Sequence, residues 1–361
     1  ASSMAQFWIL LFFIAARASE LQSRPRNLRS IVGRLSQLRR THRCKFLAEL
    51  SPRDEGELQQ VTKQDILDKL FVTSAEMERI QNLPQKVPGD LSTPNPEWIK
   101  ARQFRLTAST FGAAAGHNRY STPKQLVERL LRREHISSPA MDWGNEHERD
   151  AEAAYTMRRM SQFEAARRAR LSLRPHSHHN GPFVDTAASD AADERLIIEH
   201  PGLCIHPEKP WLAASPDGYI KEILSPETPH IRGIGEDGEE EALQTSQLGI
   251  VEYKCPYSQR ERRAASVAPF YRRMRQPSGI IAPIPPYYFD QIQGTMAVTG
   301  REWCDFVVWT PSQTQITRYY FDADYWNMSL LPALEKFYFN LLLPSLVTKE
   351  NHGVEEAVRQ H

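Results

Sequence analysis

The stretch "GIVEYKCP", residues 249–256, decides the fold class of this chain. Its three large strand-forming residues stand between a bounding glycine and a bounding proline, a composition that favours a short buried strand. Side chains along a strand alternate between two faces, so Glu252 and Lys254 project from the same side. A surface strand can carry such a pair on a solvated face, but the preceding sequence indicates another role.

The upstream stretch "PWLAASPDGYI", residues 210–220, contains a turn signature. Pro, Asp and Gly each suit a β-turn, which here separates strand-forming residues. If this strand and the 249–256 strand form a hairpin, Asp217, Glu252 and Lys254 meet at one end of a sheet. The structural alternative is that Asp217 caps a turn and that Glu252 and Lys254 form a surface ion pair.

These residue types match the needs of phosphodiester hydrolysis. Mg²⁺ prefers carboxylate oxygens and retains several waters, so Asp217 and Glu252 are predicted metal ligands. A bound metal activates water and offsets charge on the phosphate. Lys254 is then predicted to orient the attacking water, or help deprotonate it, and to stabilise developing negative charge. Mn²⁺ is a predicted substitute for Mg²⁺.

The ordered pair "SPDG…VEYKCP" resembles the motif of the PD-(D/E)XK nuclease superfamily, in the branch of phage lambda exonuclease and the YqaJ-type viral recombinases. "WGNEHERDAEAAY" (143–155) resembles a helix of that family, which implies that Glu148 lies near the metals. "YYFDQIQGTMAVTG" (287–300) resembles a second helix. This match implies that Gln291, and less directly Gln293, lies against the catalytic site.

"RQFRLTAS" (102–109) resembles the segment with which this family binds a DNA 5′-phosphate. The resemblance implies that role for Arg102 and Ser109, with Arg105 as a helper. Ser215 matches a serine that the family uses on the terminal phosphate. For Arg102 and Ser109 the alternative is a capped helix with a surface arginine; a helix N-terminus can also bind anions through its free N–H groups.

The resemblance implies an α/β fold with a restriction-endonuclease-like core, in which helices flank a mixed β-sheet. Strands are predicted at 194–199, 211–220, 250–254, 304–310 and 315–321, and helices at 61–83, 123–134, 144–160, 287–299 and 325–343. The predicted domains are an N-terminal helical or disordered extension (1–95), a nuclease domain (96–345) with insertions near 161–193 and 224–247, and a C-terminal tail (346–361). A linker is expected to end near residue 95.

Composition bounds the remaining options. A net charge of +1 and 40% hydrophobic residues are ordinary for a globular protein, and the four cysteines are too scattered for a disulfide scaffold. These features favour an intracellular setting, in the nucleus or cytoplasm, although the apolar run 7–16 raises a secretory signal at 4–18 as the alternative. The run is too short for a stable membrane span. Eight basic residues between 20 and 45 form an arm suited to nucleic acid or to solvent.

The sequence therefore predicts a Mg²⁺-dependent deoxyribonuclease, and the resemblance implies that it is an exonuclease acting on duplex DNA ends in recombination or repair. Its expected partners are DNA, including single strands, a single-strand annealing or recombination protein, and further copies of itself. The arginine-rich segment 255–277 is placed to clamp a phosphate backbone or to face solvent. The alternatives are an inactive DNA-binding module of the same fold, and an endonuclease that uses the same site.

Overall fold

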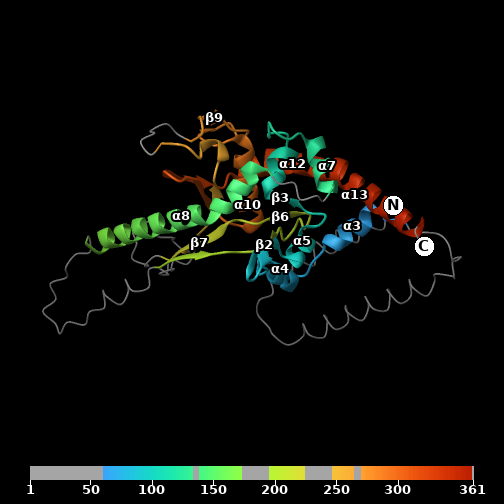
Figure 1. Cartoon of the computed structure of the whole chain (residues 1–361), viewed down its shortest axis with the longest axis horizontal. Helices are drawn as coiled ribbons and strands as arrows, with labels where there is room; N and C mark the ends of the chain where they lie inside the picture. The colour runs from blue at the N-terminus through green and yellow to red at the C-terminus, as the bar shows by residue number, and fades with distance from the viewer. Residues whose placement is uncertain (1–59, 133–137, 173–194, 224–245, 264–269, 360–361) are drawn as a thin grey trace, which may run out of the picture. The chain divides into compact units, whose positions relative to one another are not determined.

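The computed structural model describes residues 60–132, 138–172, 195–223, 246–263 and 270–359 (Figure 1). The chain divides into two units, Ala1–Gln59 and Gln60–His361, and all described residues belong to the second. The apolar run, the basic arm, most of the 161–193 insertion and most of the 224–247 loop lie outside the described residues. Predictions for those segments stay predictions.

A five-stranded mixed sheet organises the described unit, which confirms the expected α/β class. The strand order is β12-β11-β8-β7-β4, and β11 runs parallel to β8 while the other neighbours are antiparallel. The central β8 contains the quoted stretch. The strands are β4 (Arg195–Glu199), β7 (Gly218–Ile223), β8 (Ser246–Lys254), β11 (Trp303–Thr310) and β12 (Gln313–Tyr320).

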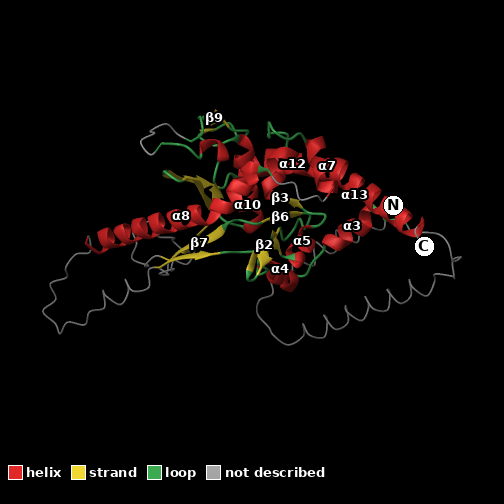
Figure 2. Cartoon of the chain, viewed as in Figure 1, coloured by secondary structure: helices red, strands yellow, loops and turns green. Residues whose placement is uncertain are grey.

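The two faces of this sheet carry two cores, as the period-two pattern requires. On one face, helix α8 (Pro139–Ser172) covers Val251 and Tyr253. On the other, helix α10 (Pro286–Thr299) packs over Ile250. Figure 2 shows both helices lying against the strands. Glu252 and Lys254 therefore point to the α10 face, within a sheet whose alternate residues are fully buried.

The strand predicted at 211–220 is divided between two sheets. Its first part is β6, which belongs to a three-stranded sheet of order β3-β6-β5, and its second part is β7. Ser215, Pro216 and Asp217 form the crossing between them. The small sheet comprises β3 (Leu106–Thr107), β5 (Cys204–Ile205) and β6 (Leu212–Ala214). The turn residues thus connect two sheets, and Asp217 immediately precedes the first residue of β7.

The segment before residue 96 differs from the expectation of one helix and a linker. Helices α3 (Lys63–Leu70) and α4 (Ser74–Gln81) are separate, each capped by a threonine. A two-stranded ladder of β1 (Lys86–Val87) and β2 (Asp90–Pro94) replaces the linker. Gly89 has a φ of +87°, which allows the tight turn between these strands. Because Ile66 lies in the main core, this region folds with the rest of the described unit.

Helix α10 is held against the short helix α6 (Phe111–Ala114) at a crossing that only glycine permits. A Cβ on Gly112 would lie 2.5 Å from the Tyr287 backbone, and a Cβ on Gly294 would lie 2.2 Å from the Phe111 ring. The preceding turn η1 (Ala108–Thr110) and helix α5 (Pro96–Arg102) complete this side. The small residues of "TASTFGAAAG" thus bring the start of α10 close to the sheet.

The C-terminal helical stretch is continuous from Ala323 and includes two π-helical turns. It consists of α11 (Ala323–Tyr325), η3 (Trp326–Leu330), α12 (Leu331–Phe337), η4 (Tyr338–Leu342) and α13 (Leu343–Arg359). Within the described ranges, the part Ala323–Gly353 is long and apolar enough to cross a membrane. Many of its apolar side chains belong to the main core, which accounts for the composition. The expected tail begins inside α13, where Leu346 is buried.

The remaining elements are one helix, one turn and a two-stranded ladder. Helix α7 (Pro123–Arg132) precedes α8, the turn η2 (Tyr257–Gln259) follows β8, and β9 (Met274–Arg275) pairs with β10 (Ile281–Ala282). The predicted helices at 123–134, 144–160 and 287–299 correspond to α7, α8 and α10. Helix α8 extends to Ser172, so the start of the 161–193 insertion is helical.

Candidate active site

Asp217 and Glu252 lie opposite each other where β7 begins. Gly218 pairs with Val251 in the antiparallel ladder, so one further step sets Asp217 across from Glu252. Directly opposed residues point to the same face of a sheet. The backbone N–H of Tyr253 donates to Asp217 Oδ2 at 2.6 Å. The hairpin expected from the sequence therefore exists and brings the two carboxylates together.

Glu252 is 3% exposed and has a divided set of contacts. Its Oε1 accepts from Lys254 Nζ at 2.6 Å and from Gln291 Nε2 on α10. Its Oε2 is buried and has no hydrogen-bond partner among the described residues. Leaving a buried carboxylate oxygen unpaired is costly, so this atom is suited to an additional ligand such as a cation.

The electrostatics of the cluster reflect crowded negative charge. Burial, followed by the nearby charge of Glu252, raises the pKa of Asp217 well above its ordinary value. Burial also opposes the charge on Lys254, but the attraction of Glu252, Tyr288 and Asp217 outweighs it and raises that pKa. The Lys254 ammonium lies 5.0 Å from the centre of the Tyr288 ring. The lysine is thus held as a cation beside two carboxylates.

A pocket of about 280 Å³ opens over Asp217 and Lys254. Its walls come from the start of α8, the turn before β7, the end of β8 and the start of α10. Its lining residues are Ala140, Met141, Gly144, Asn145, Glu148, Asp217, Tyr253, Lys254, Cys255, Pro256 and Tyr288. Four elements distant in sequence thus converge on one opening.

Glu148 projects from α8 into this pocket, as the sequence predicts. Its side chain remains solvent-exposed, yet the pocket walls partly desolvate its carboxylate. This desolvation is the largest influence and, together with the charges of Glu252 and Glu152, raises the pKa of Glu148 against the opposing charges of Lys86 and Lys254. Because the group is exposed, water screens much of this effect. Glu148 therefore adds a third negative charge at the mouth of the site.

Arg102 and Ser215 form a second cluster beside Asp217. Arg102 Nη1 donates to Ser215 Oγ at 3.4 Å, and its Nη2 donates to Thr107 Oγ1 at 3.2 Å. Thr107 Oγ1 lies 3.5 Å from Ser109 Oγ. The guanidinium packs 4.3 Å from the centre of the Trp98 ring. The guanidinium of Arg102 and three hydroxyl groups thus form one cluster, which is suited to binding an anionic group.

The charge of Arg102 has no carboxylate partner among the described residues, and burial lowers its pKa to about 10. An uncompensated, partly buried arginine is costly and is suited to binding an anion. Trp98 and Thr107 were missed by the sequence analysis. The period-four spacing of Trp98 and Arg102 on α5 could have indicated their contact.

Arg105 and Gln293 lie away from these clusters. The guanidinium of Arg105 donates to the backbone carbonyls of Ala101 and Leu70, both at 2.8 Å. Nη1 and Nη2 of Arg105 are thus occupied by backbone carbonyls, while its buried Nε has no partner among the described residues; these contacts favour a structural role for Arg105 over the helper role that the resemblance implies. Gln293 bonds the backbone of Tyr320 and Asp322, so Gln291 alone of the pair reaches Glu252.

The carboxylate oxygens of the site are the possible ligands of a metal ion. In the described part of the chain, no group of three or more His, Cys, Asp or Glu side chains could hold a metal ion. Asp217 and the unpaired Glu252 Oε2 nevertheless offer two hard oxygen donors. Mg²⁺ commonly binds through one or two carboxylates and completes its shell with waters and substrate oxygens. The residues present fit such an ion.

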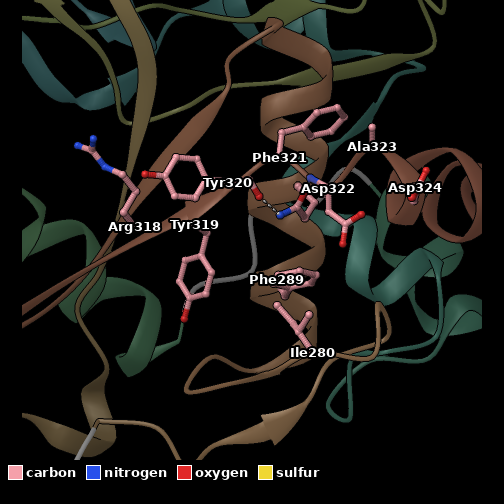
Figure 3. Close-up of a pocket in the computed structure, with 10 residues that line it drawn as sticks. Ile280, Phe289, Arg318, Tyr319, Tyr320, Phe321, Asp322, Ala323 and Asp324 are labelled. Atoms are coloured by element: carbon pink, nitrogen blue, oxygen red, sulfur yellow. Dashed lines mark hydrogen bonds between the residues drawn. The ribbon is translucent and has the colours of Figure 1, made fainter. Parts of the chain in front are cut away.

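A larger cavity of about 540 Å³ lies at the C-terminal end of the edge strand β12 (Figure 3). Two of its polar side chains are used internally: Gln293 bonds Tyr320, and Asp322 Oδ1 accepts from the backbone of Tyr325. Arg318 points away from α10 (Figure 3) and pairs with Asp305 at 2.8 Å. The larger cavity is therefore not the better candidate for the active site. The smaller pocket over Asp217 and Lys254 is the better candidate, because it contains the acidic residues and the lysine.

Comparisons with known proteins give the family of the chain. A family model for the YqaJ-like viral recombinase domain matches residues 97–302, more than half of the chain. No curated protein matches the sequence. Among solved structures, an alkaline exonuclease from Laribacter hongkongensis is similar, with 20% identity, a TM-score of 0.41, and coverage of 74% of this chain and 100% of that chain. Its complex with dAMP matches at 21% identity and a TM-score of 0.42, with the same coverage.

Proposed function

The chain belongs to the family of YqaJ-like viral recombinase domains, and from this premise we propose that it is a metal-dependent DNA exonuclease acting on duplex ends. One observation carries the proposal: Asp217, Glu252 and Lys254 lie together where β7 begins and β8 ends, with Asp217 and Lys254 lining the pocket and the Arg102–Ser215 cluster beside them. Hydrolytic chemistry and terminal-phosphate binding are thus adjacent. The resident ion is Mg²⁺, with Mn²⁺ as a substitute.

The residues divide the work of hydrolysis. Asp217 and Glu252 would hold the cation, which when bound supplies an activated water and offsets charge on the scissile phosphate. Gln291 and Lys254 both donate to Glu252 Oε1, so they leave Oε2 directed to a ligand. Lys254, held as a cation, donates to the attacking water or to the phosphate oxygens as negative charge develops. Glu148 is an auxiliary acid at the pocket mouth.

The phosphate cluster selects the end of the strand. Ser215 stands two residues before Asp217, in the crossing between β6 and β7, so a terminal phosphate at Arg102 and Ser109 would set the next phosphate near the metal site. This arrangement favours removal of nucleotides from a 5′-phosphorylated end. A role in recombination, with a single-strand annealing protein as a further partner, follows from the family alone.

The direct test compares linear and circular duplex DNA. With Mg²⁺, the full-length chain is expected to shorten a linear duplex carrying 5′-phosphates and to leave a covalently closed circle intact. Addition of EDTA is expected to stop the reaction, because the carboxylates alone do not activate water. Gel analysis of end-labelled DNA provides the measurement. Cleavage of the circle would instead indicate an endonuclease, and DNA binding without shortening would indicate an inactive binding module.

Metal binding should also appear in stability. The raised pKa of Asp217 means that the folded, metal-free protein binds more protons than the unfolded chain, so this group stabilises less as pH rises from 3.8 through the raised value. Mg²⁺ is expected to offset that loss near neutral pH, by about 2.7 kcal/mol at a hundredfold excess over Kd. The gain should shrink as pH falls through the raised pKa.

Thermal unfolding with Mg²⁺ or EDTA, at neutral and acidic pH, measures this effect. Asp217→Asn is the matched variant: it should be at least as stable as the wild type in EDTA and should gain little from Mg²⁺. An equal Mg²⁺-induced rise in Tm for both proteins would show that the ion binds elsewhere.

A further inference from the structure

A column of aromatic side chains stands on the rim of the catalytic pocket. The rings of Trp143 and His147 on α8 are 3.9 Å apart, and His147 stacks on Trp309 at 5.2 Å. Tyr257 in η2 meets Trp143 edge-on at 6.2 Å. We call Trp143, Tyr257 and Arg260 the rim platform. It is the outer end of this column, where the rings approach solvent.

The rim platform combines an available ring with positive charge. Tyr257 is 37% exposed, and the Arg260 guanidinium lies 4.1 Å from the centre of its ring. Arg260 also pairs at 3.1 Å with Glu261, whose side chain is 84% exposed. Arg263 is exposed nearby. An aromatic face next to arginines is the composition by which proteins bind single-stranded nucleic acid.

The position of the rim platform relative to the site indicates which nucleotides it would contact. The pocket is lined by Gly144 and Pro256, the chain neighbours of Trp143 and Tyr257. β7 begins and β8 ends at the site, so Ser215, two residues before Asp217, and the segment from Cys255 to Tyr257, which follows Lys254, both lie next to it. A strand with its terminal phosphate at Arg102 and its scissile phosphate at the carboxylates would continue toward Tyr257.

We propose that the rim platform is a binding subsite for the unpaired nucleotides immediately downstream of the scissile phosphate, with a base stacked on Tyr257 and a phosphate at Arg260. The proposal rests on the proposed function for the direction of the strand. It assigns Tyr257 a binding role, because this tyrosine is partly exposed while His147 and Trp309 extend the column on the other side of Trp143. The subsite would hold the strand in place between successive cleavages.

The experiment measures binding separately from cleavage. Fluorescence anisotropy in EDTA, with a labelled 5′-phosphorylated duplex that has a frayed end, is expected to show about tenfold weaker binding for Tyr257→Ala. Tyr257→Phe should bind like the wild type, since stacking needs only the ring. Tyr320→Ala is the matched control, because that tyrosine is 68% exposed at the last residue of β12, whereas the rim segment contacts the start of β12 through Arg262; the substitution should have no effect.

A second measurement uses the wild-type protein and a probe in the DNA, so its result does not depend on whether a variant folds. 2-Aminopurine placed at the first downstream nucleotide should change its fluorescence on binding, while the same probe about ten nucleotides further along should not. Tyr257-dependent binding without shortening of DNA by the wild type would refute the proposed function and leave the subsite standing.

Two results would overturn the subsite itself. One is equal DNA affinity for Tyr257→Ala and the wild type, with no probe response in the unmodified protein. The other is a change in mass by light scattering for Tyr257→Ala with unchanged DNA binding, which would make the rim platform a contact between copies of the chain.

Discussion

Replacement of Asp217 by asparagine is expected to lower DNA hydrolysis by about three orders of magnitude and to leave the fold intact. Asparagine keeps a carbonyl oxygen that can accept from the Tyr253 N–H, which now donates to Asp217 at 2.6 Å. It removes the charge that would ligate the cation, and it also removes the repulsion from Glu252. Activity and stability should therefore move in different directions.

Initial rates on linear duplex DNA, measured with thermal unfolding of the same samples, provide this comparison. Glu199→Gln is the matched control, because Glu199 is an exposed acid on the adjacent edge strand β4 and should not affect the rate. Lys254→Met should lower the rate of hydrolysis by about 10²- to 10³-fold, as expected for the loss of one hydrogen-bond donor to the negative charge that develops on the phosphate. Full activity in Asp217→Asn would remove the basis for the proposed chemistry.

Replacement of Arg102 by glutamine is expected to have the second large effect on hydrolysis, and the size of this effect depends on the chemical group at the DNA end. Hydrolysis of 5′-phosphorylated ends is expected to fall by about 10²-fold, because the terminal phosphate loses its charge-assisted hydrogen bonds. Ends that carry a 5′-hydroxyl should be affected far less, since they never made these contacts. The preference for phosphorylated ends should therefore collapse in the variant.

Arg105→Gln is the contrasting variant. Its guanidinium supports the backbone of Ala101 and Leu70, so its loss should lower the unfolding temperature and leave the preference between ends in place. Arg102→Gln should not destabilise to the same degree, because burial of its charge is uncompensated. If Arg102→Gln kept the wild-type ratio of rates on the two ends, the terminal phosphate would have to bind elsewhere.

The sequence by itself determined the strand at β8 and the common face of Glu252 and Lys254. Both follow from period-two alternation, which is a local property of the chain. The order of the short motifs was sufficient to indicate the family, which is now confirmed over residues 97–302. The hairpin that joins Asp217 to Glu252 could also be predicted, since sequential strands commonly pair.

Only the tertiary structure decided which of several equivalent polar residues face the site. Arg102 and Arg105 stand three residues apart, yet Arg105 donates to the backbone carbonyl of Leu70 while Arg102 donates to Ser215. Gln291 reaches Glu252, while the backbone of Tyr320 and Asp322 holds Gln293. The physical reason is that a side chain's direction depends on partners from distant segments of the chain. Local pattern sets the face on which a residue lies, and packing selects the atom that it contacts.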